Sequence, residues 1–195
     1  MPSQKGRRWL ITGATRGLGE ATAFAAAEAG ATLILPSRDL ARAEELNAEL
    51  GGRHEIVHLD LAGLDMIRET AKAITGDIDV LVNNAGVLTV NLVEDLTEEE
   101  WQRAFDVNAK GTFLVTQAVI PHMKSRRSGR IIHISSIGGK QGAPGQAHYC
   151  SSKAATIEFT RVLAMELGPY GITVNAVCPG IILTEMGRQN LGTQE

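Results

Sequence analysis

Between a short apolar run and a segment of helical period, the sequence reads Thr12-Gly13-Ala14-Thr15-Arg16-Gly17-Leu18-Gly19. Glycines at a strand-to-helix turn let the backbone approach a pyrophosphate, whose charge then lies at the N-terminus of the helix. The spacing G-x-x-x-G-x-G differs from the G-x-G-x-x-G of the general dinucleotide fingerprint. The loop therefore predicts a phosphate site, and a turn that only caps a helix is the alternative.

Around this loop, apolar runs of strand length alternate with segments of helical period. Runs that are apolar on both faces are typical of a parallel sheet covered by helices. The alternation predicts one α/β domain over residues 1–195, a doubly wound parallel sheet with helices on both faces. The expected strands are Arg8–Thr12, Thr32–Pro36, Glu55–Leu59, Val80–Asn83, Arg130–Ser135 and Thr173–Cys178. The expected helices are Leu18–Ala29, Leu40–Leu50, Leu64–Ile74, Thr97–Lys124, with Thr97 and Glu100 as a capping box, and Ala147–Leu167.

The composition of the 195 residues excludes several classes of protein. The formal net charge of −3 argues against binding to a nucleic-acid backbone. Two cysteines, Cys150 and Cys178, are too few for a disulfide framework and indicate a reducing, cytoplasmic compartment. No apolar run approaches the roughly 20 residues of a membrane span, and the apolar stretch after the basic N-terminus is too short for a signal peptide. We expect neither a nucleic acid nor a membrane as partner.

One motif matches a zinc site by its letters alone. The stretch His54-Glu55-Ile56-Val57-His58 reads H-E-x-x-H, which binds zinc when both histidines share one face of a helix. Here the stretch follows two glycines and continues as a short apolar strand. On a strand the two Cα atoms would lie about 13 Å apart, too far for one metal ion. We therefore predict a sheet strand and no metal site.

A serine, a tyrosine and a lysine follow the fifth apolar run. Ser136 is thirteen residues before Tyr149, and Lys153 is four residues after Tyr149. On a helix, residues four apart are neighbours, so the ammonium of Lys153 would lower the pKa of the Tyr149 phenol toward working pH. A phenol tuned in this way suits general acid–base catalysis. From the spacing alone, a surface Tyr–Lys pair beside a Ser-rich loop explains the pattern equally well.

Together these residues resemble the short-chain dehydrogenase/reductase family over essentially the whole chain. The resemblance rests on T-G-x-x-x-G-x-G at 12–19, N-N-A-G at 83–86, Asn108, Ser136 with Tyr149-x-x-x-Lys153, and P-G-x-I-x-T at 179–184. It implies a single Rossmann-type sheet and an NAD(P)-dependent enzyme that moves a hydride between nicotinamide and a small-molecule alcohol or carbonyl. A homodimer or homotetramer, formed by the helices at 97–124 and 147–167, is also implied.

The resemblance assigns a role to each catalytic residue. Tyr149 would pass a proton to or from the substrate oxygen, and Ser136 would hydrogen-bond that oxygen. Lys153 would lower the pKa of Tyr149 and bind the nicotinamide ribose, and Asn108 would hold a water that links Lys153 to solvent. The implied cofactor residues are Gly13, Thr15, Arg16, Gly17, Leu18, Gly19, Ser37, Arg38, Asp60, Leu61, Asn84, Ala85, Gly86, Tyr149, Lys153, Pro179, Gly180, Ile182 and Thr184.

The end of the second strand predicts which nicotinamide is bound. An acidic residue there selects NAD, because it would repel a 2′-phosphate. By alignment with the family, Ser37 takes that position and Arg38 follows it, while Arg16 would approach the same phosphate from the glycine loop. Asp39 is the one contrary charge, and it suits the N-cap of the next helix. The expected cofactor is NADP(H) in preference to NAD(H).

Family members usually continue past the P-G-x-I-x-T loop into a substrate-covering segment and a seventh strand. This chain ends at Glu195, eleven residues after Thr184, so either the natural protein is longer or it is a short member. Two further readings are a non-catalytic dinucleotide-binding sensor or scaffold, and an inactive fragment. The joint presence of Ser136, Tyr149, Lys153 and Asn108 favours the enzyme, because a sensor needs only the nucleotide loops.

Overall fold

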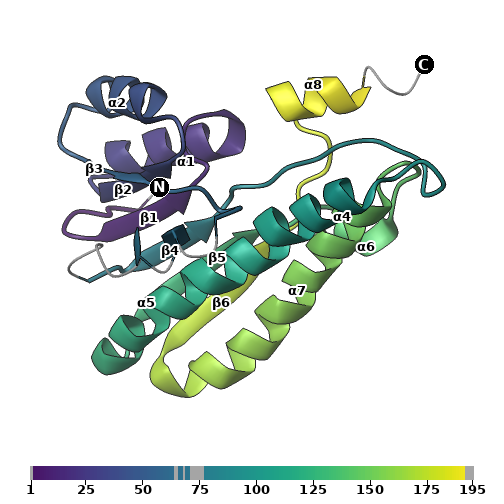
Figure 1. Ribbon diagram of the computed structural model, residues 1–195. Helices are drawn as coiled ribbons and strands as arrows, with labels where there is room; N and C mark the ends of the chain where they lie inside the picture. Colours follow the sequence, from purple (N-terminus) through teal and green to yellow (C-terminus); the bar gives the residue numbers. More distant parts are fainter. Residues whose placement is uncertain (1, 64–65, 68, 71–76, 192–195) are drawn as a thin grey trace.

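The fold is built on six parallel strands that lie side by side in the order β3-β2-β1-β4-β5-β6 (Figure 1). The computed structural model describes residues 2–63, 66–67, 69–70 and 77–191. Every expected strand is present, with ends shifted by one residue at most, and the predicted doubly wound α/β sheet is confirmed. The strands are β1 (Arg8–Thr12), β2 (Thr32–Ser37), β3 (Glu55–His58), β4 (Val80–Asn83), β5 (Gly129–Ile134) and β6 (Ile172–Val177).

Alternate residues of the central strands enter two separate cores. In β1, Trp9 and Ile11 pack on one face of the sheet, and Leu10 packs on the other. The same alternation places Leu81 of β4 with Leu10, as expected for side chains that point to opposite faces along a strand. Helices α1 (Gly17–Glu28) and α2 (Leu40–Glu49) cover the first face, and α5 (Thr112–Arg126) and α7 (Ala147–Leu167) cover the second (Figure 1).

The expected helix from Thr97 to Lys124 is divided into three parts. Helix α4 (Glu98–Phe105) begins at the capping box that Thr97 and Glu100 form, as predicted. A π-helical turn, η1 (Asp106–Gly111), then leads into α5. Short helices α6 (Gly138–Gln141), η2 (Gly168–Tyr170) and α8 (Glu185–Leu191) complete the described elements. The helix expected at Leu64–Ile74 lies largely outside the described residues.

Side chains from two helices explain the π-helical turn. The carbonyl of Asn108 accepts hydrogen bonds from the hydroxyls of Thr112, at 2.9 Å, and of Thr156 on α7, at 3.2 Å. These bonds satisfy a carbonyl that the wider turn releases from the ordinary helical pattern, and π-turns of this kind are frequent at functional sites. Apolar periodicity carries no signal for such a turn, so the sequence predicts an unbroken helix.

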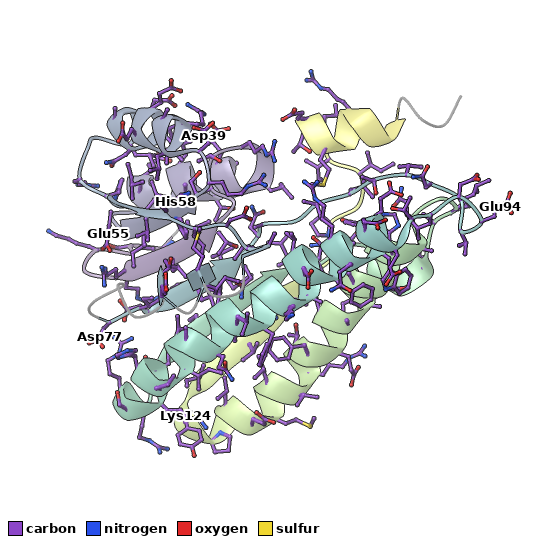
Figure 2. The ribbon with its side chains drawn as sticks, in the orientation of Figure 1. Asp39, Glu55, His58, Asp77, Glu94 and Lys124 are labelled. Carbon is purple, nitrogen blue, oxygen red and sulfur yellow. The ribbon has the colours of Figure 1, made fainter. Side chains whose placement is uncertain are left out.

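The H-E-x-x-H stretch forms a strand, as predicted. Glu55 and His58 lie on β3 at the edge of the sheet (Figure 2). His54 is buried, and its Nδ1 accepts a hydrogen bond from the backbone N–H of Leu33 at 3.1 Å. This hydrogen bond joins the residue just before β3 to β2, so Nδ1 of His54 already has a structural partner. Among the described residues no cluster of three His, Cys, Asp or Glu side chains could hold a metal ion, and no helix is long and apolar enough to cross a membrane.

A buried histidine makes the fold sensitive to acid. His133 on β5 is fully buried, and its Nδ1 lies 2.8 Å from the Thr160 hydroxyl of α7. Burial, assisted by the nearby charge of Lys153, lowers the pKa of His133 to about 4. Because the histidine of the unfolded chain binds its proton near the ordinary pKa of 6.5, stability is lost as the pH falls from about 6.5 through 4.

We predict that His133→Gln, which cannot titrate, removes much of this acid sensitivity. The parent should lose about 3 kcal/mol of unfolding free energy across this interval through His133 alone. Urea unfolding at pH 7 and at pH 4.5 measures the loss in each variant. His122→Gln, at an exposed position of α5, is the matched control and should behave like the parent. An equal loss in the parent and in His133→Gln would refute the assignment.

Candidate active site

The glycine loop packs directly on the segment that follows β4. A Cβ atom at Gly13 would lie 2.8 Å from the Cα of Ala85, and one at Gly19 would lie 2.1 Å from the carbonyl oxygen of Gly13. Side chains at these two positions would therefore collide with backbone. Gly17 has a positive φ of 58°, which favours glycine. The loop thus presents bare backbone at the N-terminus of α1, the arrangement that a dinucleotide pyrophosphate requires.

Thr12 and Asn84 hold the loop in place. The Thr12 hydroxyl accepts the backbone N–H groups of Asn84 and Ala85, at 3.0 and 3.1 Å. The side-chain amide of Asn84 donates to the carbonyls of Thr12 and Gly13, at 3.1 and 3.0 Å. The Asn84 side chain is therefore used within the protein, although the resemblance assigns it to the cofactor. Thr12 was not among the predicted site residues. Its place as the first residue of the T-G-x-x-x-G-x-G motif is the sequence signal that could have identified it.

The residues at the end of β2 include an exposed arginine, Arg38, and a carboxylate, Asp39, that is hydrogen-bonded to the next helix. Ser37 is buried, and its hydroxyl donates to the carbonyl of Asp39 at 2.9 Å. The Asp39 carboxylate accepts the backbone N–H of Arg42 at 3.0 Å and so caps α2, as expected, at the position labelled in Figure 2. Arg38 is exposed beside them. Across the glycine loop, Arg16 lies 3.6 Å from the Glu185 carboxylate of α8, and both side chains are exposed.

Asp60 and Leu61, which the resemblance assigns to the adenine side of the cofactor site, lie in a tight turn after β3. The Asp60 carboxylate accepts the backbone N–H of Ala62 at 2.9 Å, which stabilises the turn. Leu61 is buried in the core, against the backbone of Gly111 in the π-helical turn. Both side chains thus have structural partners, and contacts from this turn to an adenine ring remain predicted from the resemblance alone.

Ser136 and Tyr149 meet at the carboxyl end of β5. Ser136 follows β5 by two residues, and its Oγ accepts the backbone N–H of Gly138 at 3.0 Å. Tyr149 lies in the first turn of α7, and its ring borders Gly138 together with Ser136: a Cβ at Gly138 would lie 3.4 Å from Ser136 Oγ and 3.7 Å from Tyr149 Cε1. Burial raises the pKa of Tyr149 above its ordinary value, and the nearby Ser136 hydroxyl opposes this only in part. The expectation of a lowered pKa is therefore wrong for the structure described here.

Lys153 is a buried cation held against the same strand. Only 4% of the residue is exposed, and Nζ donates to the carbonyl of Ile134 at 2.8 Å. Nζ lies 5.8 Å from the centre of the Tyr149 ring. Burial lowers the pKa of Lys153 to about 8. Desolvation thus acts on both groups of the Tyr–Lys pair and disfavours both charged forms, which helical spacing alone does not reveal.

Asn108 and Gly86 lie beside Lys153. A Cβ at Gly86 would lie 3.3 Å from both Asn108 Oδ1 and Lys153 Nζ, so Gly86 leaves the space between them open. The Asn108 amide donates to the carbonyl of Val87 and to Ser152 Oγ, each at 3.0 Å, and its Oδ1 accepts the N–H of Val87 at 2.8 Å. The side chain ties β4 to α7, and the expected water relay is not tested by these contacts.

The P-G-x-I-x-T loop connects the catalytic strand end with the glycine loop. The Pro179 carbonyl accepts the backbone N–H of Ile137 at 2.9 Å, next to Ser136. Thr184 Oγ1 accepts the N–H of Gly187 at 3.2 Å, which begins α8, and a Cβ at Gly17 would lie 3.3 Å from the Thr184 methyl group. The loop therefore brings the two halves of the predicted site together, with Gly180 and Ile182 exposed between them.

The geometry agrees with the comparisons to known proteins. Residues 7–195 match the family model described as short chain dehydrogenase. The chain belongs to this family. A 3-oxoacyl-[acyl-carrier-protein] reductase of Synechocystis is 41% identical over 192 residues, covering 95% of this chain and 77% of the relative. A cyclopentanol dehydrogenase of Comamonas is 39% identical over 188 residues, covering 93% of this chain and 75% of that protein.

Solved structures of the family have the same fold. A putative NAD(P) dependent gluconate 5-dehydrogenase from Beutenbergia cavernae, with bound NADP at low occupancy, matches with a TM-score of 0.93 at 34% identity. The match covers 98% of this chain and 78% of that one. A 3-ketoacyl-(acyl-carrier-protein) reductase from Brucella melitensis complexed with NADH matches with a TM-score of 0.90 at 32% identity, covering 95% and 80%. The expectation of an oxidoreductase of this family, acting on alcohol and carbonyl groups, is confirmed.

Proposed function

We propose that this chain is an NADP(H)-dependent oxidoreductase that reduces a ketone to an alcohol, with Tyr149 as the general acid. The observation that carries the proposal is that Ser136, Tyr149 and the buried ammonium of Lys153 come together at the carboxyl end of β5. A dinucleotide sensor or scaffold has no use for these three groups in one place. Asn108, held next to Lys153, completes the predicted catalytic set.

Tyr149 has the protonation state that a proton donor needs. Because burial raises its pKa, the phenol carries its proton at neutral pH. A carbonyl oxygen placed within hydrogen-bond distance of both hydroxyls would be polarised by Ser136 and would receive the proton of Tyr149 as negative charge develops on it. The raised pKa of Tyr149 keeps the phenol protonated before the reaction. Tyr149 can therefore donate a proton at once, which is the step that carbonyl reduction requires.

Lys153 stabilises the state that follows proton donation. At pH 7, below its pKa of about 8, the ammonium is charged for most of the time. Once Tyr149 has lost its proton, the phenolate lies close to this cation in a region shielded from water, where the attraction is stronger than in water. We assign Lys153 to this electrostatic role, and Asn108 to holding β4 and α7 in register around it.

The cofactor site fits a nicotinamide dinucleotide. The bare backbone of the glycine loop suits the pyrophosphate, and the space at Gly86 lies beside Lys153, where a ribose hydroxyl would meet the ammonium. When bound, the cofactor supplies the hydride. The curated relatives are a 3-oxoacyl reductase and a cyclopentanol dehydrogenase, so a 3-oxoacyl thioester and cyclopentanone are the first substrates to test.

We predict that Tyr149→Phe abolishes NADPH-dependent reduction of these ketones. Loss of a positioned proton donor costs about 10²–10⁴-fold in kcat, while the retained ring keeps cofactor affinity within about twofold. Loss of reduced-nicotinamide absorbance measures turnover, and calorimetric titration measures NADPH binding. Tyr170→Phe, which removes the hydroxyl of a tyrosine on η2, should leave both unchanged. Turnover of Tyr149→Phe close to that of the parent would refute the assignment.

Two arginines support NADP(H) as the cofactor: Arg38 directly after β2 and Arg16 in the glycine loop. Ser37 imposes no charge repulsion on a 2′-phosphate, Arg38 is exposed, and the Asp39 carboxylate is already occupied by the N-terminus of α2. The ion pair of Arg16 with Glu185 is exposed and therefore weak, so Arg16 can exchange this partner for a phosphate. A guanidinium binds phosphate oxygens through two parallel hydrogen bonds.

We predict that NADPH binds at least about tenfold more tightly than NADH, because each charge-assisted contact contributes about 1.5–3 kcal/mol. Calorimetric titration of both cofactors measures the ratio. Ser37→Asp combined with Arg38→Ala should reverse it. Arg53→Ala, which removes an exposed cation at the opposite end of α2, should not change it. Equal or tighter binding of NADH to the parent would contradict the proposal.

An exposed apolar face on α4, α5 and α7 supports a homodimer or homotetramer. Trp101, Phe113 and Val162 are about 40% exposed, and Met165 is 71% exposed. Phe113 of α5 packs edge-on against Phe159 of α7, with ring centres 6.0 Å apart. The apolar face therefore extends from α5 to α7. Large apolar side chains in such an arrangement are typical of a protein–protein interface. We also propose a cytoplasmic location, since Cys150 and Cys178 are both free thiols.

We predict a dimeric or tetrameric mass for the parent at micromolar concentration by light scattering. Phe113→Glu combined with Met165→Glu should yield monomers, because the two carboxylates would be buried without partners. Leu40→Glu, at a comparably exposed apolar position of α2, is the control and should keep the parent's mass. A monomeric parent would remove the proposal.

A further inference from the structure

The segment after β4 is tied to the first turn of α7 by two hydrogen bonds. The backbone N–H of Asn91 donates to the carbonyl of Gly145 at 2.9 Å, just before α7 begins. Thr89 Oγ1 lies 2.8 Å from Nε2 of His148, the residue that precedes Tyr149. Neither contact belongs to the catalytic set or to the cofactor loops, yet both reach the turn that carries the phenol.

The same segment is anchored to the start of α4 through Glu100. Both carboxylate oxygens of Glu100 accept the side-chain amide of Asn91, at 2.8 and 2.9 Å. The carboxylate also accepts the backbone N–H of Thr97 at 3.2 Å. These bonds, of which the bond to Thr97 is the strongest influence, lower the pKa of Glu100, so at neutral pH it acts only as an acceptor.

The contact with Thr89 is the one hydrogen bond of the His148 ring within the described part of the chain. Nε2 lies 2.8 Å from Thr89 Oγ1, and Nδ1 is buried without a hydrogen-bond partner among the described residues. His148 is only 1% exposed, so water does not replace a lost partner easily. Removing the Thr89 hydroxyl would therefore leave a buried imidazole with neither nitrogen bonded.

We propose that Thr89 and His148 are positioning residues for Tyr149, on a segment that Asn91 anchors to Glu100 of α4. The first turn of a helix lacks intrahelical partners for its N–H groups and opens most easily, and Tyr149 lies in that turn. Ser135 Oγ donates to the carbonyl of Lys153 at 2.8 Å and holds the next turn to the end of β5. The Thr89–His148 contact supplies the matching constraint toward the segment after β4, which fixes the phenol beside Ser136.

This inference rests on the proposed role of Tyr149, and two variants at each position separate hydrogen bonding from packing. Thr89→Val keeps the shape and removes the hydroxyl, while Thr89→Ser restores it. His148→Leu removes the hydrogen-bonding nitrogen, whereas His148→Gln can place an amide group near the position of Nε2. Thr173→Val, at an exposed position of β6, is the control for loss of a threonine hydroxyl elsewhere.

We expect Thr89→Val and His148→Leu to lower kcat for NADPH-dependent reduction of cyclopentanone or the 3-oxoacyl thioester by about tenfold. KM for the ketone and NADPH affinity should change by less than about twofold, and Thr89→Ser and His148→Gln should recover most of kcat. Parent-like kcat in both Thr89→Val and His148→Leu, or a loss confined to KM, would overturn the proposal.

A second measurement does not need turnover and so separates this proposal from the proposed function. Nitrogen-15 spectra of the His148 imidazole should show a change in the Nε2 signal when Thr89→Val removes the hydroxyl, and no change in Thr173→Val. Amide hydrogen exchange at residues 147–150 should accelerate in Thr89→Val and His148→Leu and stay at the parent's rate in Thr173→Val. Unchanged exchange in both variants, or an Nε2 signal that is the same in Thr89→Val and the parent, would overturn the positioning role even if the parent proved to be inactive.

Discussion

The burial of the Lys153 ammonium is the constraint on which the site depends. A lysine amine without solvent must find acceptors, and Nζ reaches the carbonyl of Ile134 at the end of β5. That bond needs α7 to lie close against β5, which Ser135 secures through its bond to the Lys153 carbonyl. Close packing here also requires Gly139, where a Cβ would lie 2.8 Å from the carbonyl carbon of Lys153. The position of Tyr149 one helical turn away follows from the same packing.

Desolvation around that cation explains why the pair behaves differently from an exposed one. In water, an ammonium four residues from a phenol would make the phenolate easier to form. Inside the protein, burial disfavours the charged form of each group, and this cost exceeds the attraction between an ammonium and a phenolate, so the neutral forms of both Tyr149 and Lys153 are favoured. The attraction becomes dominant only when proton transfer leaves a phenolate beside a charged lysine. An enzyme that donates a proton benefits from this order of events, because the donor is protonated at rest.

Local sequence patterns predicted the parts of the molecule that depend on local chemistry. The apolar runs gave the six strands, the Thr97–Glu100 spacing gave a capping box, and Asp39 was recognised as a helix cap. The glycine spacing indicated the phosphate loop, because steric limits at Gly13 and Gly19 act within a few residues along the chain or across one sheet neighbour. The catalytic residues required the resemblance as well, since spacing alone left Tyr149 and Lys153 indistinguishable from a surface pair.

What the sequence could not predict depends on contacts between distant segments. The π-helical turn exists because Thr156, on another helix, bonds to Asn108, and no periodicity within residues 97–124 encodes that partner. The Asn84 amide is turned to the glycine loop by carbonyls seventy residues earlier in the sequence, and the pKa of Tyr149 depends on how completely β5, α6 and α7 exclude water. Thr89 and His148 lack a motif of their own, because their contact arises only when the segment after β4 is folded against α7. Function in this chain is therefore specified at two levels: motifs place the reacting groups on the carboxyl ends of the strands, and long-range hydrogen bonds set their protonation and orientation.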